Sequence, residues 1–103
     1  MPTAYITVPP ADAATIAETL VEERLAACVN RVSCRSTYRW DGDVTTDDEE
    51  ILIAKTTSER YEAFASRVRD IHPYDVPCIE RFDESAVDEP FAEWCRRAVS
   101  DEP

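Results

Sequence analysis

The sequence contains one glycine, one lysine and one histidine among its 103 residues: Gly42, Lys55 and His72. A single glycine leaves no glycine-bearing loop after the first predicted strand that could cradle a phosphate group. A single histidine leaves no second imidazole to activate Cys28 as a nucleophile. We therefore expect no self-contained enzyme active site, and an acylphosphatase-like hydrolase is disfavoured.

The sequence also lacks a long apolar segment. No run approaches the ~20 residues that cross a bilayer, and residues 1–10 have neither the basic nor the apolar part of a signal peptide. We therefore expect a cytoplasmic protein. The composition, 44% hydrophobic and 32% charged, is globular, and the length fits a single domain over residues 1–103.

Positive charge is scarce. Eleven Lys and Arg residues face 22 Asp and Glu residues, so the formal net charge is −11. Such a surface repels phosphate backbones, which argues against nucleic acids and anionic membranes as partners. The acid-rich, lysine-poor composition is typical of adaptation to a high-salt cytosol, in which salt screens the repulsion between carboxylates. An ordinary acidic protein is the alternative.

The four cysteines show no metal-binding or redox spacing. Cys28, Cys34, Cys78 and Cys95 form no CxxC or CxxxC pair, so a structural zinc site and a thioredoxin-like pair are unsupported. In a reducing compartment the default interpretation is small buried apolar residues.

The hydrophobic pattern alternates between strand and helix periods. It predicts strands over residues 4–8 and 76–82, and helices over 11–27, 58–71 and 90–99. Because proline lacks a backbone N–H, Pro77 inside the last strand favours an edge position or a bulge.

A long β-hairpin is predicted in the first half of the chain. Residues 31–40 alternate with a period of two, and the return strand runs over residues 44–56. Between them Asp41-Gly42 is typical of a two-residue turn, because both turn positions need a positive φ. This turn would place Arg35 opposite Asp48, so that arginines partly offset an acidic stretch.

The predicted order is β-α-β-β-α-β with a short C-terminal helix, which is the α+β, ferredoxin-like split βαβ arrangement. Hairpin strands of ~12 residues reach ~40 Å, beyond the ~26 Å diameter of a domain of this length. The tip therefore projects into solvent or packs on another chain. Because Tyr38 and Trp40 lie on an exposed edge strand, we expect an oligomer.

Six stretches of the sequence carry a family resemblance. They are LAACVN at 25–30, YRWDGDV at 38–44, Glu49, KTT at 55–57, HPYDVP at 72–77 and FAEW at 91–94. In their order and spacing they resemble the CutA family of divalent-cation tolerance proteins over almost the whole chain. The combination of LAACVN and HPY is the most specific part.

The resemblance implies a ferredoxin-like subunit in a tight homotrimer, and binding of copper or other divalent metals. His72 matches the histidine of the family's His-Pro-Tyr element. The family's other proposed ligands fall on Ile71, on Thr7 or Val8, and on Cys78, which replaces a glutamate. We therefore expect any metal at His72 and Cys78, with a thiolate that suits Cu(I). The alternative is that His72 only ends a helix and Cys78 only fills the core.

Five residues are predicted to lie at the oligomer interface: Tyr38, Trp40, Glu49, Lys55 and Trp94. A lone lysine in a chain that otherwise uses arginine suggests a point-charge contact, with Glu49 or with a carboxylate of another subunit. The aromatic residues are expected to pack between subunits, and an aromatic ligand cage is the alternative.

Two hypotheses of function follow. The first is a CutA-like homotrimer for divalent metal binding and tolerance. The second is a trimeric scaffold or signalling module that binds a small ligand or a protein partner in clefts between subunits, without catalysis. The fold alone does not decide between them.

Overall fold

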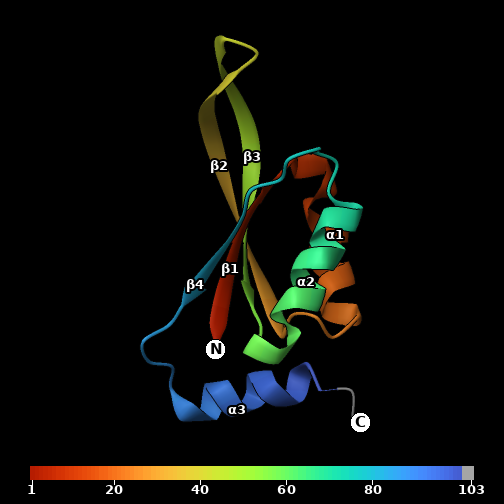
Figure 1. Ribbon diagram of the computed structural model, residues 1–103, viewed down its shortest axis with the longest axis vertical. Coiled ribbons are helices and arrows are strands. Elements are labelled where there is room, and N and C mark those ends of the chain that lie inside the picture. Colours follow the sequence, from red (N-terminus) through yellow and green to blue (C-terminus); the bar gives the residue numbers. More distant parts are fainter. Residues whose placement is uncertain (101–103) are drawn as a thin grey trace.

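The computed structural model describes residues 1–100, which form four strands and three helices (Figure 1). The order is β-α-β-β-α-β followed by a helix, which confirms the predicted ferredoxin-like α+β fold. The elements are β1 (Pro2–Val8), α1 (Pro10–Glu22), β2 (Cys28–Trp40), β3 (Asp43–Lys55), α2 (Ser58–Ile71), β4 (Ile79–Asp83) and α3 (Glu89–Ala98).

The four strands form one antiparallel sheet in the order β2-β3-β1-β4. Helices α1 and α2 lie side by side over one face of this sheet, and α3 crosses the end of the sheet at which β1 begins (Figure 1). We call the face under α1 and α2 the covered face and the opposite one the open face.

The covered face holds the main hydrophobic core. Alternate residues of the two central strands point into it, and Ile6 and Leu52, which are register partners, are fully buried. The helices supply the other side of this core with Ala13, Ile16 and Leu20 from α1 and Phe64 and Val68 from α2. Removal of these side chains from water stabilises the single subunit.

Helix α1 ends at Glu22, so its predicted extension to Ala27 is wrong. Arg24 adopts a left-handed conformation with φ 61°, which turns the chain out of the helix. The N–H groups of Leu25 and Ala26 then donate to the Leu20 carbonyl at 2.9 and 3.1 Å. Both residues are buried, so they enter the core from a loop although their apolar character continues the helical pattern.

The predicted hairpin and its register are confirmed. Asp41 and Gly42 form the turn with φ values of 50° and 84°. Arg35 is the register partner of Asp48, and its Nε lies 3.1 Å from the Asp48 Oδ1.

The outer half of the hairpin projects from the rest of the molecule (Figure 1). The pairing of β1 with β3 ends at Val8 and Glu50, whereas β2 and β3 stay paired to Trp40 and Asp43. The overall extents of 47 × 26 × 21 Å reflect this projection. A single subunit therefore leaves the hairpin tip without a core of its own.

The last strand starts later than the pattern predicts. β4 begins at Ile79 rather than Val76, because Pro77 donates no backbone hydrogen bond and the chain joins the sheet only beyond it. Its position at the sheet edge confirms the expectation from Pro77. Helix α2 occupies the predicted range, and α3 is shifted by one residue from it.

Candidate functional site

The open face of the sheet presents apolar side chains to solvent. Directly paired residues of an antiparallel sheet share a face, so the register places Val32 beside Ile51 and Phe82 beside Thr3 on the open face. Val32 is 45% exposed, Phe82 50% and Trp40 63%. Large exposed apolar side chains on one sheet face mark an interaction surface.

A cavity of about 630 Å³ opens on this face, between the outer half of the hairpin and the loop that follows α2. We call it the hairpin cleft. Its lining residues are Thr7 of β1, Ser36, Tyr38 and Trp40 of β2, Glu49 of β3, and Pro73, Tyr74, Asp75, Val76 and Cys78 of the loop.

Two phenol–carboxylate hydrogen bonds organise the cleft. The Tyr74 hydroxyl donates to Glu49 Oε2 at 2.9 Å, which ties the loop after α2 to β3. The Tyr38 hydroxyl donates to Asp47 Oδ2 on the same hairpin. Burial and the bond to Glu49 raise the pKa of Tyr74 to about 12, and the bond to Asp47 raises the pKa of Tyr38.

His72 is a buried structural anchor beside the cleft. Its Nδ1 accepts from the Tyr74 backbone N–H at 3.1 Å, and its Nε2 lies 2.8 Å from the Thr7 carbonyl oxygen. A backbone N–H can only donate and a carbonyl can only accept, so the ring proton resides on Nε2. One neutral tautomer satisfies both contacts, and both nitrogens are engaged. His72 also ends α2, as its position before Pro73 predicts.

Cys78 contributes its thiol group to the lining of the cleft. It is half-buried, and its thiol donates to Glu80 Oε1 at 3.5 Å. Burial, and then the bond to Glu80, raise the pKa of this thiol, so the thiolate is disfavoured in the free protein.

The fit to a metal ion within one subunit is poor. Within residues 1–100, no group of three or more His, Cys, Asp or Glu side chains is arranged to hold a metal ion. His72 would have to release a backbone partner before it could coordinate. The assignment of a metal to His72 and Cys78 therefore stays a prediction.

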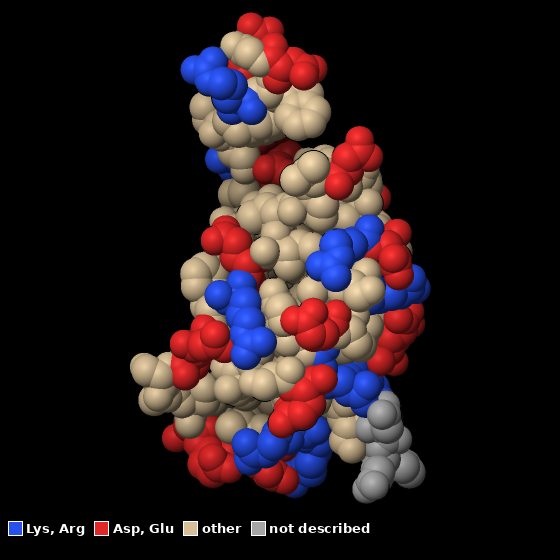
Figure 2. Space-filling view, viewed as in Figure 1, with Lys and Arg blue, Asp and Glu red and all other residues tan. Residues whose placement is uncertain are grey.

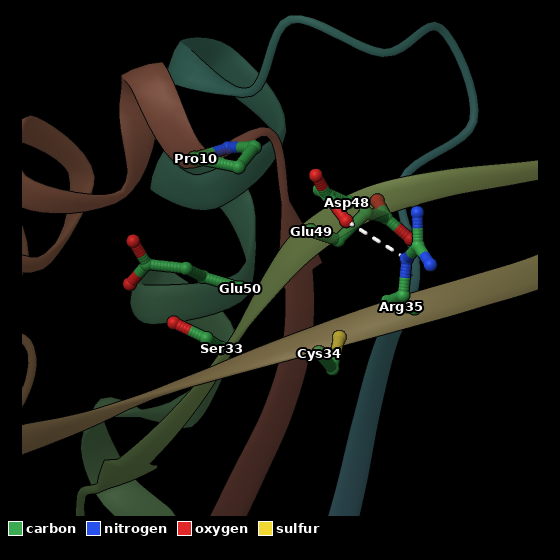
Figure 3. A pocket seen from close by; sticks show the side chains of 7 residues that line it. All are labelled: Pro10, Ser33, Cys34, Arg35, Asp48, Glu49 and Glu50. Atoms are coloured by element: carbon green, nitrogen blue, oxygen red, sulfur yellow. Dashed lines mark hydrogen bonds and ion pairs between the residues drawn. The ribbon is translucent and has the colours of Figure 1, made fainter.

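A second hollow, of about 580 Å³, lies beside the hairpin near the start of α1 (Figure 3). Its charged residues already have partners: Arg35 pairs with Asp48, and Glu50 accepts two hydrogen bonds from Arg31. Glu49, which also contributes to its lining, is bonded to Tyr74. These pairs leave the second hollow without free groups of evident function.

Of the five predicted interface residues, Lys55 and Trp94 lie apart from the other three. Lys55 donates to the Thr3 hydroxyl at 3.3 Å, and six residues along β3 separate it from Glu49 of the same subunit by about 20 Å, which rules out a contact between these two. Its contact with a carboxylate of another subunit stays a prediction. Trp94 lies on α3, half exposed and stacked on Phe91. Tyr38, Trp40 and Glu49 come together in the hairpin cleft.

Sequence reasoning missed the roles of Tyr74 and Asp75. Both lie in an irregular loop, where no periodicity shows the direction of a side chain. The sequence does contain one signal for this site, which is Glu49. Side chains alternate between the two faces of a strand, and this alternation places the Glu49 carboxylate on the same face as Tyr38 and Trp40.

No helix in the described part of the chain is both long and apolar enough to cross a membrane.

Comparisons with known proteins agree with the fold. The family model for the CutA1 divalent ion tolerance protein matches residues 3–98. The divalent-cation tolerance protein CutA of Thermus thermophilus is 45% identical over 93 residues, which are 88% of this chain and 90% of that protein.

Two solved structures are similar over nearly their whole length. The crystal structure of CutA1 from Pyrococcus horikoshii gives a TM-score of 0.94 at 34% identity and covers 98% of this chain and 100% of that one. The PII-like protein CutA from a Nostoc species, in apo form, gives a TM-score of 0.94 at 28% identity and covers 97% and 98%.

Proposed function

The chain belongs to the CutA1 divalent ion tolerance family, and from this premise we propose that it is a homotrimeric divalent-cation tolerance protein. It binds its ligand in the hairpin cleft and catalyses no reaction. The observation that carries the proposal is the match of the CutA1 family model to residues 3–98, and the hairpin cleft, whose lining includes Cys78, Glu49 and Asp75, is the proposed place of binding.

The open face supports assembly with further copies of the chain. Val32, Phe82 and Trp40 are apolar or aromatic and exposed in the single subunit. β2 is a 13-residue edge strand, and its outer backbone groups are available for pairing. A closed symmetric oligomer would cover both features. The number three is what the family resemblance implies.

Copper as Cu(I) is the metal that the donors favour. A thiolate is a soft ligand, and Cys78 reaches the cleft. His72 is the second donor in this proposal, but it must first release the Tyr74 N–H or the Thr7 carbonyl. The raised pKa of Cys78 adds a cost for deprotonation. Affinity is therefore modest and falls as pH falls, since protons compete with the metal for the ligands.

A competition titration of Cu(I) against a chromophoric chelator tests this site. Wild type, Cys78→Ser and His72→Ala are compared after light scattering has shown equal masses. Loss of the thiolate weakens Cu(I) binding by about tenfold or more, because it removes the softest donor. Loss of His72 has the smaller effect, because its nitrogens are already engaged. Equal affinities for all three proteins would place the metal elsewhere.

A small-ligand module is the second candidate function. The aromatic residues of the cleft, Tyr38, Trp40 and Tyr74, are not metal donors but suit an organic molecule. The similar Nostoc structure is described as PII-like. In this version the trimer binds a small ligand or a protein partner in clefts between subunits and acts as a scaffold or signalling protein.

The proposal also includes the location of the protein, which we infer from its net charge. The net charge of −11 with a single lysine supports adaptation to a salt-rich cytoplasm. Acidic side chains are spread over the face seen in Figure 2, interspersed with basic ones, rather than gathered in one patch. This distribution supports general screening by salt rather than a localised polyanionic site.

A further inference from the structure

We propose that Lys55 of one subunit forms an ion pair with Glu49 of the next subunit and thereby completes the wall of the hairpin cleft. The pairing rests on the homotrimer proposed above, and it names the residue that a neighbouring copy of the chain contributes to the cleft. It does not depend on which ligand the cleft binds.

The charge on the open face is unbalanced. The alternation of side chains along the strands places four carboxylates and one cation on this face of the described sheet. These residues are Asp43, Asp47, Glu49, Glu80 and Lys55. The hairpin arginines, Arg31, Arg35 and Arg39, alternate with them and lie on the other face. Lys55 is therefore the cation that the sheet of one open face can offer to another.

Glu49 is a buried carboxylate with one oxygen unused. It is 7% exposed, and its Oε2 accepts the hydrogen bond of the Tyr74 hydroxyl at 2.9 Å. Within residues 1–100 no Lys, Arg or His side chain forms an ion pair with it, and its Oε1 accepts no hydrogen bond. A subunit that covers the open face removes the remaining water from this carboxylate. A buried anion is costly unless an opposite charge compensates it.

Lys55 lacks the complementary charge. Its side chain is half-buried, and its ammonium group donates to the Thr3 hydroxyl at 3.3 Å. Its register partners on the two neighbouring strands are Thr3 and Cys28, neither of which is a carboxylate. No carboxylate in the described part of the chain forms an ion pair with it. Glu49 of the same subunit is about 20 Å away along β3, so the two charges cannot meet within one chain.

A ring of identical subunits brings these two charges together without a second kind of chain. In a cyclic oligomer each interface joins one surface patch of a subunit to a different patch of the next. Each subunit then gives its Lys55 to one neighbour and receives an ammonium group at Glu49 from the other. Both charges are paired in every copy, although each of them is unpaired in the single subunit.

The free oxygen of Glu49 also accounts for a lysine at position 55. A guanidinium group binds both oxygens of a carboxylate best, whereas an ammonium group is a point charge that one oxygen satisfies. Because Tyr74 already occupies Oε2, only Oε1 remains for an incoming cation. The eleven cationic residues of the chain include a single lysine, and this geometry gives that lysine a specific role.

Exchange of the two charges tests the pair. Wild type, Glu49→Lys, Lys55→Glu and the double variant are compared by light scattering over a dilution series, after circular dichroism has shown that each is folded. Each single substitution places like charges together at every interface, so the concentration at which the oligomer dissociates should rise about tenfold or more. The double variant restores an opposite pair at every interface and should recover most of this loss.

The matched controls lie on α2. Glu62→Lys and Arg69→Glu change the net charge by the same amounts as the two single variants, and both positions are exposed on a helix that covers the other face of the sheet. They should leave the dissociation concentration unchanged.

Neutral substitutions keep the test decisive if a reversed charge prevents folding. Glu49→Gln and Lys55→Met each leave one covered charge without a partner and should raise the dissociation concentration about tenfold. The variant with both substitutions should dissociate at a lower concentration than the product of the two single effects gives. Arg39→Met removes an equal charge from the hairpin and should show no such coupling to Glu49→Gln.

Three results would overturn the pair. A trimeric wild type whose Glu49 and Lys55 variants dissociate no more readily than the α2 controls would refute the pair and leave the homotrimer intact. Independent effects of the two positions, without recovery in either double variant, would mean that the charges do not face each other. Coupling of Glu49→Gln to Arg39→Met in place of Lys55→Met would assign the cation to Arg39. A wild type with the mass of one subunit would refute both the pair and the homotrimer.

Discussion

The two faces of the sheet are built from the same strands and differ in what covers them. On the covered face, Ile6 and Leu52 are fully buried beneath α1 and α2. On the open face, Val32 and Phe82 are apolar as well, yet about half of each side chain is exposed. The chain therefore carries two apolar faces and enough helix to cover one of them, and the second face is the one that also carries the hairpin cleft.

A charge introduced on the open face tests most directly whether this face is covered by other subunits. Val32→Asp places a carboxylate where the trimer interface would bury it, at a cost of about 3 kcal/mol or more per subunit. The expected result is a shift to the mass of one subunit in light scattering at micromolar concentration.

Val44→Asp is the matched control. Val44 lies on the same hairpin but, by register with Arg39, on the opposite face from Tyr38 and Trp40, and it is 66% exposed. The substitution changes the net charge equally and should leave the mass of the oligomer unchanged. Dissociation by both variants to the same extent would show that net charge, rather than the open face, controls assembly.

The dependence of the melting temperature on salt separates the apolar core from the acidic surface. The core of the covered face is apolar, so its stability contains little direct charge repulsion. The surplus of carboxylates lies outside that core, and their repulsion is screened within ~10 Å at 0.1 M salt and within ~3 Å at 1 M. The melting temperature should rise strongly with KCl into the molar range. A melting temperature that stays flat between roughly 0.1 and 3 M salt would remove the case for adaptation to salt.

The smallest expected effect comes from Tyr74 in the cleft. Burial and the bond to Glu49 raise its pKa to about 12, above that of an ordinary tyrosine, so the folded protein holds the phenol proton more tightly than the unfolded chain. The stabilisation is complete below pH ~10 and is lost as pH rises through about 12. The shift corresponds to at most about 2.7 kcal/mol, which solvent screening at a side chain this exposed reduces to about 1 kcal/mol.

Denaturant unfolding on both sides of this pH range measures that loss. Tyr74→Phe serves as the control, because it lacks the titrating group and should lose correspondingly less stability in alkali. An identical alkaline loss in wild type and Tyr74→Phe would show that the bond to Glu49 contributes nothing.

The sequence predicts the elements with strong local signals. Asp41-Gly42 fixes the turn and with it the register of the hairpin, because a two-residue turn allows only one pairing. Helix α2 is predicted over its full range from its apolar stripe and from His72-Pro73, which ends it. In the structure the Thr57 hydroxyl oxygen accepts from the Arg60 N–H at the start of this helix.

Tertiary contacts explain what the sequence does not predict. Leu25 and Ala26 continue the apolar stripe of α1 but reach the core through a left-handed turn at Arg24. The Glu49–Tyr74 bond joins a strand to an irregular loop 25 positions away, and no local pattern encodes that meeting. The cleft therefore becomes visible only when the loop is placed over the open face.

The mass of the wild-type protein in molar salt tests the central claim most directly. Light scattering on a sizing column should give three times 11.7 kDa at micromolar concentration, because the open face and the edge of β2 are then covered by two further copies. A mass of 11.7 kDa under the same conditions would contradict the account, since the open face would then remain exposed in solution.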